Sequence, residues 1–545
     1  MRLRIRGGCP ACRWLLVLAA LCSGLGAADS QGPESSNTRL NWSSESAAIA
    51  HWEVRPRSED AAWQSLVSLD SSGNPLSRHF EVGLGSARWT PVVADDRDLH
   101  STTRSYESDD GETLLELSIE PAAQTNRWLL TISLESRSET ARTDESLAVQ
   151  LGPGLGEEPM EGMGIATTLY SYVDPVVRVG GSVFTPDLDS EEPLTSLDLN
   201  NWQEGDWVGL NSRYFALLLE SRSGTEPSRL SVGLDDANIP GGPPARYLPW
   251  LRLHLPVPEL TADEPVKWQF EVYAGPKSLV GLRADGDDSY SELLFHSLWN
   301  WMLGLALGLL WLLEVLYALI PSWGLAICLL AVLVRVMLHP LVRWALISQQ
   351  RFADVQRVIQ PQIVQIKRQY KGEEQSERIL ELYESRGVSP LAGLKPLLIV
   401  LIQVPIFIAM FHVLGQAYEL RDASFLWIDS LAEPDQLFRF GIDLPFFGAW
   451  FNILPVLMAV TTLLTIKLSP APAATAADRR RQNLFLGFLA VAFFLLFYPF
   501  PSGMVLYWTV ANILHIAQAR LFRQRADGED GGEDGGESVE QHGDA

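Results

Sequence analysis

The sequence contains no cysteine between residues 29 and 290, although this stretch makes up almost half of the 545-residue chain. Its four cysteines are Cys9, Cys12, Cys22 and Cys328. A disulfide framework therefore cannot stabilise this stretch. The spacing from Cys9 to Cys12 is that of a redox or zinc half-site, but no second Cys/His pair follows it, so we predict no metal site.

Positive charge is also scarce in this stretch. Residues 29–290 hold 43 acidic and 19 basic side chains, which accounts for the formal net charge of −24 of the whole chain. Phosphate groups require a basic surface, so direct nucleic-acid binding by this part is excluded. The second half contains several apolar runs long enough to cross a bilayer. Two unlike halves are joined in one chain.

Residues 1–28 are typical of an export signal. Four arginines precede the apolar run from Trp14 to Leu21, and small residues follow at Gly26, Ala27 and Ala28. Cleavage after Ala27 or Ala28 and retention as an N-terminal signal anchor both remain open. In either case the following segment is delivered across the membrane.

Residues 29–290 are predicted to form an exported β-sandwich domain. Apolar and polar residues alternate with a period of two, and Gly/Pro-rich breakers separate the runs. Trp268, Phe270 and Val272, for example, are expected to share one face of a strand. The clearest strands are predicted at 113–121, 127–136, 213–221, 247–256 and 266–275.

The β domain shows no catalytic constellation. His51, His79 and His100 are scattered near its start, and His254 stands alone. We interpret them as ordinary surface or core residues. Exposed aromatic residues would suit a carbohydrate cleft, but aromatic residues at alternate strand positions are usually part of the core. No catalytic residue and no cofactor are predicted, so the chain is not expected to be an enzyme.

Residues 291–321 contain an apolar run from Met302 to Ile320, interrupted by Glu314 and ended by Pro321. Its length alone would allow a span. The charge balance described next favours an interfacial helix on the outer surface, with Trp299, Trp301 and Trp311 at the membrane boundary. Whether 302–320 spans or lies on the membrane stays open.

The topology of residues 322–524 follows from the distribution of positive charge. Nine Lys/Arg lie between 341 and 395 and four between 467 and 481, whereas 416–446 is acidic. With the β domain outside, one crossing must precede the first positive loop. Five spans then leave the C-terminus inside, and they are predicted at about 323–343, 396–415, 449–467, 483–500 and 503–521.

Residues 346–390 are predicted to form a cytoplasmic helical hairpin. Apolar residues recur at helical spacing from Phe352 to Tyr370 and resume after Gly372. Pro361 should bend or restart the first helix. A solvated link and a docking surface both remain open. The final segment, 525–545, is acidic and Gly-rich, which predicts a disordered tail.

Arg335 lies deep within the first predicted span. At ~1.5 Å per residue it would be ~18 Å from Trp323, and a cation at that depth costs roughly 2.5–3.5 kcal/mol on insertion scales. No Asp or Glu occurs in the other four predicted spans, so we expect Arg335 to face water inside the protein. The polar or aromatic candidates to join it are Gln403, Asn452, Tyr507, Trp508, Thr509 and Asn512.

A secondary transporter or channel that uses Arg335 as an intramembrane anion site is the main alternative from another class. The lack of intramembrane carboxylates and of a visible inverted repeat counts against it. A third hypothesis is an envelope binding module, in which the β domain grips a glycan or a partner and the spans serve as an anchor.

Five stretches together resemble the YidC membrane protein insertase family, in its Gram-negative form with a large periplasmic domain. Three lie in the predicted membrane domain: "LAVLVRVMLHPL" (330–341), "PLLIVLIQVPIFIAMFHVL" (396–414) and "FPSGMVLYWTVANILHIAQ" (500–518). Two lie in the exported part: "WVGLNSRYFALLL" (207–219) and "YAGPKSL" (273–279). The resemblance runs from roughly residue 40 to 524.

The resemblance implies a five-span core around a hydrophilic groove with one arginine, a position that Arg335 matches. Trp508 matches an aromatic residue facing the groove, and Gln403, Asn452 and Asn512 are assigned to the groove by span and polarity. The implied function is insertion and folding of nascent membrane proteins in the bacterial inner membrane, alone or with the Sec translocon. The hairpin would receive substrates and offers a ribosome contact, which the acidic tail does not.

Overall fold

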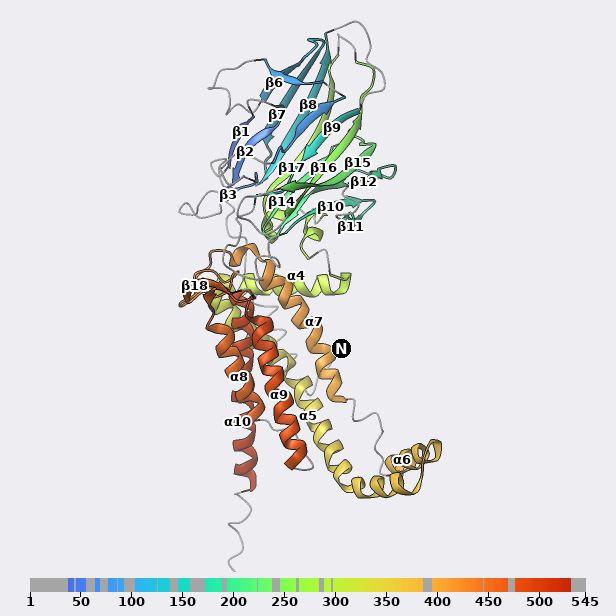
Figure 1. Ribbon diagram of the computed structural model, residues 1–545, viewed down its shortest axis with the longest axis vertical. Helices are drawn as coiled ribbons and strands as arrows, with labels where there is room; N and C mark the ends of the chain where they lie inside the picture. Colours follow the sequence, from blue (N-terminus) through green and yellow to red (C-terminus); the bar gives the residue numbers. More distant parts are fainter. Residues whose placement is uncertain are drawn as a thin grey trace, which may run out of the picture.

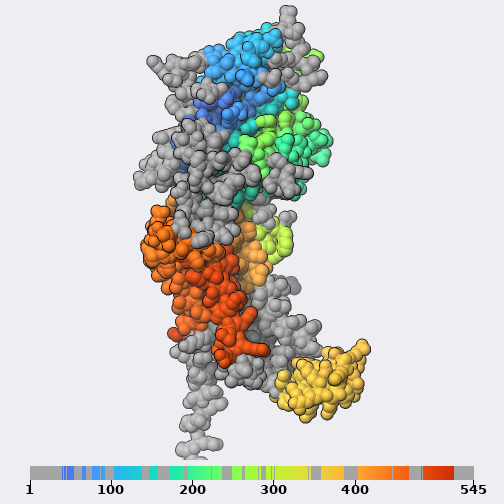
Figure 2. Space-filling model, in the orientation of Figure 1, coloured from blue at the N-terminus to red at the C-terminus, as the bar shows by residue number. Residues whose placement is uncertain are grey.

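The computed structural model divides into a β-rich N-terminal domain and a C-terminal group of helices (Figures 1 and 2). This agrees with the predicted order of the two parts. The residues that the structure describes are 38–43, 46–54, 64–68, 77–85, 87–92, 103–124, 126–137, 146–156, 172–188, 194–222, 224–237, 246–260, 264–283, 289–295, 298–385, 395–444, 446–468 and 476–530.

The N-terminal domain is built from three antiparallel sheets. The largest has nine strands in the order β11-β10-β13-β14-β17-β8-β7-β6-β5, the second has five in the order β12-β15-β16-β9-β4, and β1-β2-β3 form the third. The strands are β1 (Thr38–Trp42), β2 (Ile49–Val54), β3 (Gln64–Ser65), β4 (Glu81–Leu84), β5 (Trp89–Pro91), β6 (Thr103–Ser108), β7 (Thr113–Pro121), β8 (Arg127–Ser136), β9 (Ser146–Leu151), β10 (Val173–Val179), β11 (Ser182–Phe184), β12 (Leu194–Asp198), β13 (Trp207–Ser212), β14 (Phe215–Ser221), β15 (Arg229–Ala237), β16 (Arg246–Pro256) and β17 (Val266–Pro276).

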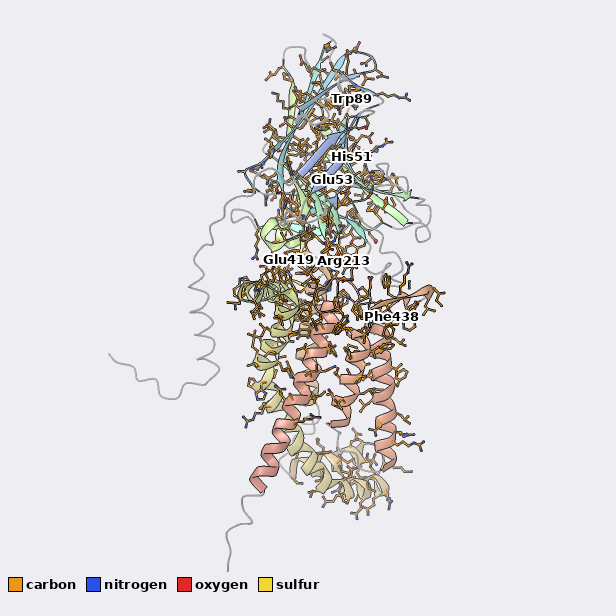
Figure 3. The ribbon with its side chains drawn as sticks, turned by 90° about the vertical axis from the view of Figure 1, so that its left-hand side faces the viewer. His51, Glu53, Trp89, Arg213, Glu419 and Phe438 are labelled. Atoms are coloured by element: carbon orange, nitrogen blue, oxygen red, sulfur yellow. The ribbon has the colours of Figure 1, made fainter. Side chains whose placement is uncertain are left out.

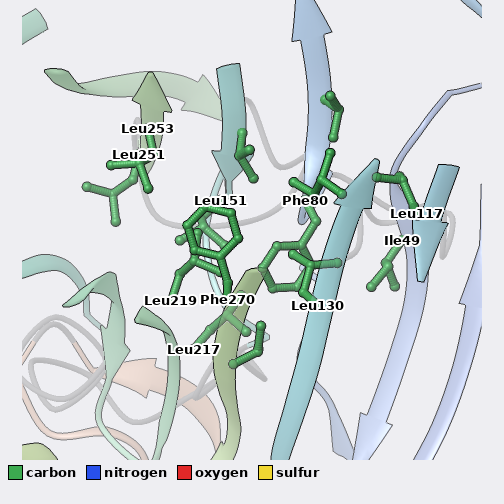
Figure 4. Packing of buried hydrophobic residues seen from close by; sticks show 14 of the residues in the cluster. Ile49, Phe80, Leu117, Leu130, Leu151, Leu217, Leu219, Leu251, Leu253 and Phe270 are labelled. Atoms are coloured by element: carbon green, nitrogen blue, oxygen red, sulfur yellow. The ribbon is translucent and has the colours of Figure 1, made fainter. Parts of the chain in front are cut away.

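The sandwich core follows the two-residue period of the strands. Trp268, Phe270 and Val272 lie in one buried cluster, as the alternation predicted. Figure 4 shows Phe270 of β17 beside Leu130 of β8 and opposite Leu151 of β9. The two larger sheets therefore bury their facing side chains against each other, and the sandwich-like fold of this domain is confirmed.

Strand β14 is buried on both faces. Leu217 and Leu219 belong to the sandwich core, whereas Ala216 and Leu218 belong to a second cluster that continues into the C-terminal helices. Between these two parts lie the short helices α3 (Leu279–Leu282) and η3 (Ser289–Leu293). The unbroken apolar run of this strand reflects its position between two cores.

His79 is an ordinary core residue, as we interpreted it. Its side chain is buried, its Nε2 lies 3.0 Å from the Leu66 carbonyl oxygen, and its Nδ1 accepts from the Gly152 N–H at 3.1 Å. Burial lowers the pKa of His79 to about 4. His254 contacts the Ser231 hydroxyl, His51 is exposed, and His100 lies outside the described residues.

The C-terminal part contains helices α4 (Asn300–Leu319), α5 (Trp323–Gln369), α6 (Glu373–Ser385), α7 (Lys395–Gln416), α8 (Leu454–Leu468), α9 (Ala476–Phe497) and α10 (Ser502–Asp530). Helix α4 runs across the end of the group beneath the β domain, while α5, α7, α8, α9 and α10 extend away from it (Figure 1). Segments Trp301–Leu319 and Trp323–Leu341 are long and apolar enough to cross a membrane; shorter apolar stretches occupy Gln403–Gln416, Leu454–Thr465 and Asn483–Phe497.

Several helix bounds differ from the predicted spans. Helix α8 begins at Leu454 rather than near 449, because Gly448–Phe451 form strand β19, which pairs with β18 (Phe438–Leu444). Helix α5 continues through Pro340 and Pro361 to Gln369, so the predicted span and the first arm of the hairpin are one helix. Each proline removes a single backbone donor and does not end the helix here. Helix α10 extends to Asp530, into the expected tail.

Helix α6 is joined to α5 by a turn at Gly372, whose positive φ of 71° suits glycine. The Gln375 amide nitrogen donates to the carbonyl oxygens of Lys367 and Tyr370 at 3.2 and 2.9 Å. Lys367 lies in the last turn of α5 and Tyr370 caps its C-terminal end, where carbonyl oxygens lack partners within the helix. The turn between the two helices is thereby fixed.

Arg213 connects the β domain to the helices. This arginine follows β13 and is 2% exposed. Its Nε donates to the Gly415 carbonyl oxygen at 2.9 Å, and its Nη2 donates to that of Ala432 at 2.6 Å. Figure 3 shows Arg213 at the junction of the two parts. The guanidinium also lies 4.7 Å from the centre of the Tyr214 ring.

Lys277 is also buried. It lies close to this junction, since its backbone N–H donates to the carbonyl oxygen of Tyr214 at 2.7 Å. Burial lowers its pKa to about 7 from an ordinary value of 10.5, and the charge of Asp174 opposes that shift. Between these two values the unfolded chain binds more protons than the folded one. Stability should therefore rise with pH there, by up to about 1.4 kcal/mol per pH unit.

We expect the thermal unfolding temperature of the full chain in detergent to rise between pH 7 and pH 9, and Lys277→Met to abolish most of that rise. Lys267, which is exposed on β17, provides the matched control, and Lys267→Met should retain the pH dependence. Equal slopes in the wild type and in Lys277→Met would contradict the prediction.

Candidate functional site

Arg335 lies on α5, twelve residues after its first residue, and its side chain is half-buried. Its Nε donates to Gln518 Oε1 at 3.0 Å, and its Nη2 contacts His515 Nδ1. Because arginine is only a donor, His515 accepts this contact with an unprotonated nitrogen. No carboxylate forms an ion pair with Arg335 in the part of the chain that the structure describes. The cation is thus held by neutral groups.

One side of α10 carries a tryptophan followed by two polar residues that contact α8 and α5. Trp508, Asn512 and His515 follow at steps of four and three residues, which places them along one stripe of the helix. Asn512 Nδ2 donates to Thr462 Oγ1 of α8 at 2.8 Å, whereas His515 contacts Arg335 of α5. Helix α10 therefore connects its two neighbours through polar contacts at different heights.

Trp508 belongs to an aromatic cluster contributed by three helices. Its ring centroid lies 5.2 Å from that of Phe407 on α7, 6.1 Å from that of Phe493 and 5.6 Å from that of Phe497, both on α9. The side chain is half-buried. Trp508 thus packs between α7 and α9, one turn of α10 before Asn512.

Asn452 lies elsewhere, just before α8. It is buried; its Nδ2 donates to the Tyr498 carbonyl oxygen at 3.0 Å, and its Oδ1 accepts from the Gln436 N–H at 3.1 Å. Asp435 Oδ2 accepts from the N–H groups of Ile453 and Leu454 at 2.9 and 3.0 Å and so caps α8. The structure places Asn452 in this capping network and does not bring it together with Arg335.

Gln403 is half-buried on α7. Within the described residues, no hydrogen bond joins it to Arg335. Two of the predicted residues, Trp508 and Asn512, therefore lie on the same stripe of α10. Arg335 contacts α10 further along the helix, at His515 and Gln518.

Side-chain burial changes along the helices. Between Trp323 and Leu341, the buried residues of α5 are all at or before Val334, and residues 335–341 are half-buried or exposed. In α7 and α8 the buried side chains, among those described, likewise lie in the half nearest the β domain. Arg335 is the first residue of α5 beyond this tightly packed region.

The end nearest the β domain is closed by the segment between α7 and β18. Leu420, Leu431 and Ala432 of this segment are buried. The backbone N–H groups of Ser502 and Gly503 donate to the carbonyl oxygens of Glu433 and Leu431 at 2.7 and 2.8 Å. A Cβ on Gly503 would lie 3.0 Å from the Leu431 oxygen, so only glycine fits without displacement.

Comparisons with known proteins all point to one family. Residues 315–529, which include Arg335 and the whole stripe of α10, match the family model described as 60Kd inner membrane protein. The chain is 34% identical over 264 residues to a membrane protein insertase YidC of Syntrophobacter fumaroxidans. These findings support the YidC family.

The YidC relatives are matched over only part of their length. The alignment with the Syntrophobacter fumaroxidans protein covers 48% of this chain and 44% of that relative. A YidC of Thiobacillus denitrificans is 29% identical, with 68% of this chain and 61% of the relative covered. A crystal structure described as an active YidC insertase with its first transmembrane domain resolved covers 93% of this chain and 98% of its own, at 19% identity and a TM-score of 0.32. That score is too low to support an argument.

Sequence reasoning missed His515 and Gln518 as partners of Arg335. Both lie within the stretch 500–518 on which the YidC resemblance rests. Their spacing was the available signal: Asn512, His515 and Gln518 follow at steps of three residues, which keeps them on neighbouring positions of one helix surface.

Proposed function

We propose that this chain inserts and folds nascent membrane proteins in a bacterial inner membrane. The observation that supports it best is Arg335, a half-buried cation without a carboxylate partner among the described residues, at the point where tight helix packing ends. In a dry bundle such a charge would require a fixed counter-charge. Its neutral partners and partial exposure favour a wetted groove that opens away from the β domain.

The groove would lower the barrier for polar segments that must cross the lipid. Each unsatisfied backbone group costs several kcal/mol in hydrocarbon. A groove that reaches partway across shortens the dry path, and Arg335 attracts acidic residues of the incoming segment. Partition of the client's apolar helix into lipid and the membrane potential acting on negative charge supply the driving force. No nucleotide or other cofactor takes part.

The proposed topology places the β domain in the periplasm and five spans in the membrane. The spans are α5 up to about residue 343, α7, α8, α9 and α10, with α4 lying on the outer surface. The C-terminal end of α5 and α6 then form the cytoplasmic hairpin, which would receive substrates and contact the ribosome. The Sec translocon is a second proposed partner, and Gln403, Trp508 and Asn512 are proposed to line the groove beside Arg335.

Reconstitution into liposomes separates this function from its main rival. An insertase should integrate a newly synthesised single-span client into vesicles that contain only this protein. A secondary transporter or channel with an anion site at Arg335 should instead conduct small anions without inserting clients. Anion flux in the absence of client insertion would overturn the proposal.

Deletion of residues 60–280 tests the third hypothesis. An insertase should keep much of its activity, because the proposed groove lies entirely in the C-terminal helices. A binding module that uses the β domain to grip a glycan or a partner should lose all of its activity.

A further inference from the structure

The β18–β19 hairpin has one apolar face. In the antiparallel register Phe438 pairs with Phe451 and Arg439 pairs with Trp450. Ring contacts join Phe438, Phe440 and Phe451 in one cluster on this face. The register then shifts between Arg439 and Leu444, where Gly441 has a positive φ of 79°. The rings of Phe438 and Phe451 stack at 4.9 Å, and Phe440 meets Phe438 edge-on at 5.6 Å.

The other face of the hairpin is partly polar. The Arg439 guanidinium lies 6.0 Å from the centre of the Trp450 ring. A cation over an aromatic ring is a common arrangement at exposed sites. The hairpin is therefore amphipathic, with three phenylalanines on one side and an arginine on the other.

The apolar face is exposed. The exposed fractions are 49% for Phe438 and 39% for Phe440, and Ile442 of the same strand is 65% exposed. The hairpin is a separate two-stranded sheet, and such a sheet is marginally stable in water without further packing. Something apolar is needed to cover this face.

The position of the hairpin indicates what covers it. It lies at the end of the helices nearest the β domain, at about the level of α4, and projects sideways (Figures 1 and 3). Figure 2 shows the same orange segment protruding beside the red helices. At that level Trp299, just before α4, and Trp301 and Trp311 of α4 are exposed. Aromatic residues of this kind are typical of the membrane–water boundary.

The exposed apolar surface continues from the hairpin onto the adjoining helix. Helix α8 begins three residues after β19 and exposes Leu457, Val460 and Leu463. These residues lie at steps of three along one side of α8. A lipid environment that covers α8 therefore extends to the hairpin without interruption.

We propose that the β18–β19 hairpin is a lipid anchor whose apolar face enters the boundary between headgroups and acyl chains in the outer leaflet. Arg439 reaches from the opposite face toward the lipid phosphates, as long basic side chains do at interfaces. The anchor holds the outer end of α8. Asp435 caps this end by accepting from the Leu454 N–H, and Asn452 binds it to the Tyr498 carbonyl oxygen. The inference rests on the membrane placement proposed above.

Depth-dependent fluorescence quenching tests the anchor. An environment-sensitive fluorophore is attached to a cysteine at position 442 of the full chain, with the native cysteines replaced by serine, in phosphatidylethanolamine and phosphatidylglycerol vesicles. We expect at least twofold stronger quenching by lipids with a nitroxide near the headgroup than by lipids with one near the chain end. Absence of quenching at 442 would overturn the anchor.

Two further positions make the result specific. Leu194 on β12 is 60% exposed and Val491 on α9 is 57% exposed, so they match Ile442 in accessibility. The label at 194 should not be quenched, and the label at 491 should be quenched more by the deeper nitroxide. Quenching at 491 without quenching at 442 rejects the anchor and leaves a protein partner as the occupant. Loss of quenching at both positions would instead reject the membrane placement.

Discussion

Replacing Arg335 with alanine should lower the insertion of clients with acidic translocated segments about tenfold and leave clients with neutral segments nearly unaffected. Two unit charges 4 Å apart attract by about 4 kcal/mol at an effective dielectric constant of about 20. Desolvation offsets part of this attraction, and about 1.4 kcal/mol of remaining preference corresponds to a factor of ten. The measurement is the inserted fraction of paired clients that differ only in the acidic residues of the translocated segment.

Two variants separate the charge from the structure around it. Arg335→Lys keeps the cation and should retain most insertion of acidic clients, although it loses the second donor that contacts α10. His515→Ala removes a neutral partner of Arg335 and should leave the preference for acidic clients in place. Equal loss for acidic and neutral clients in Arg335→Ala would indicate a structural role and contradict the prediction.

Replacing Arg213 with methionine should uncouple the β domain from the helices and lower the free energy of that association by about 3–5 kcal/mol. The buried guanidinium donates to the carbonyl oxygens of Gly415 and Ala432. Hydrogen bonds to charged groups contribute about 1.5–3 kcal/mol each, and the two carbonyl oxygens would be left without these donors. We expect faster proteolysis between the two parts and a lower unfolding temperature in detergent.

Arg222 provides the matched control for Arg213. It pairs with Glu271 in the same domain but its side chain is 51% exposed, so Arg222→Met should have a much smaller effect. Client insertion should survive Arg213→Met, because the proposed groove does not include the β domain. Unchanged proteolysis and unfolding in Arg213→Met would show that the junction does not depend on this residue.

The strands were predictable because their signal is local. Strands β7 and β8 have the bounds that the two-residue alternation gave, Thr113–Pro121 and Arg127–Ser136. Helix α8 was less predictable, because the apolar residues 449–451 pair with a strand that begins eleven residues earlier at Phe438. Pairing between strands leaves no trace in helical periodicity, so the predicted span begins about five residues before the helix does.

The candidate site likewise contains residues that the sequence indicates and residues that it does not. Arg335 stands out in the sequence because a cation in an apolar run is costly. Its partners His515 and Gln518 do not, since polar residues on a helix are common and their contact with α5 depends on how two helices pack. In the sequence, Arg213 cannot be distinguished from other polar residues that follow a strand. Its contacts with Gly415 and Ala432 depend on the tertiary structure.

Site-specific photo-crosslinking during translation tests the central proposal, that nascent chains pass along Arg335 and Trp508. A photoreactive residue is placed at 335 or at 508 in the full chain, and a stalled client carrying a neutral translocated segment is used, so that loss of the cation at 335 does not prevent entry. The proposal predicts adducts with the nascent client from both positions and none from Leu194 of the β domain. Adducts with lipid alone from both positions would contradict it.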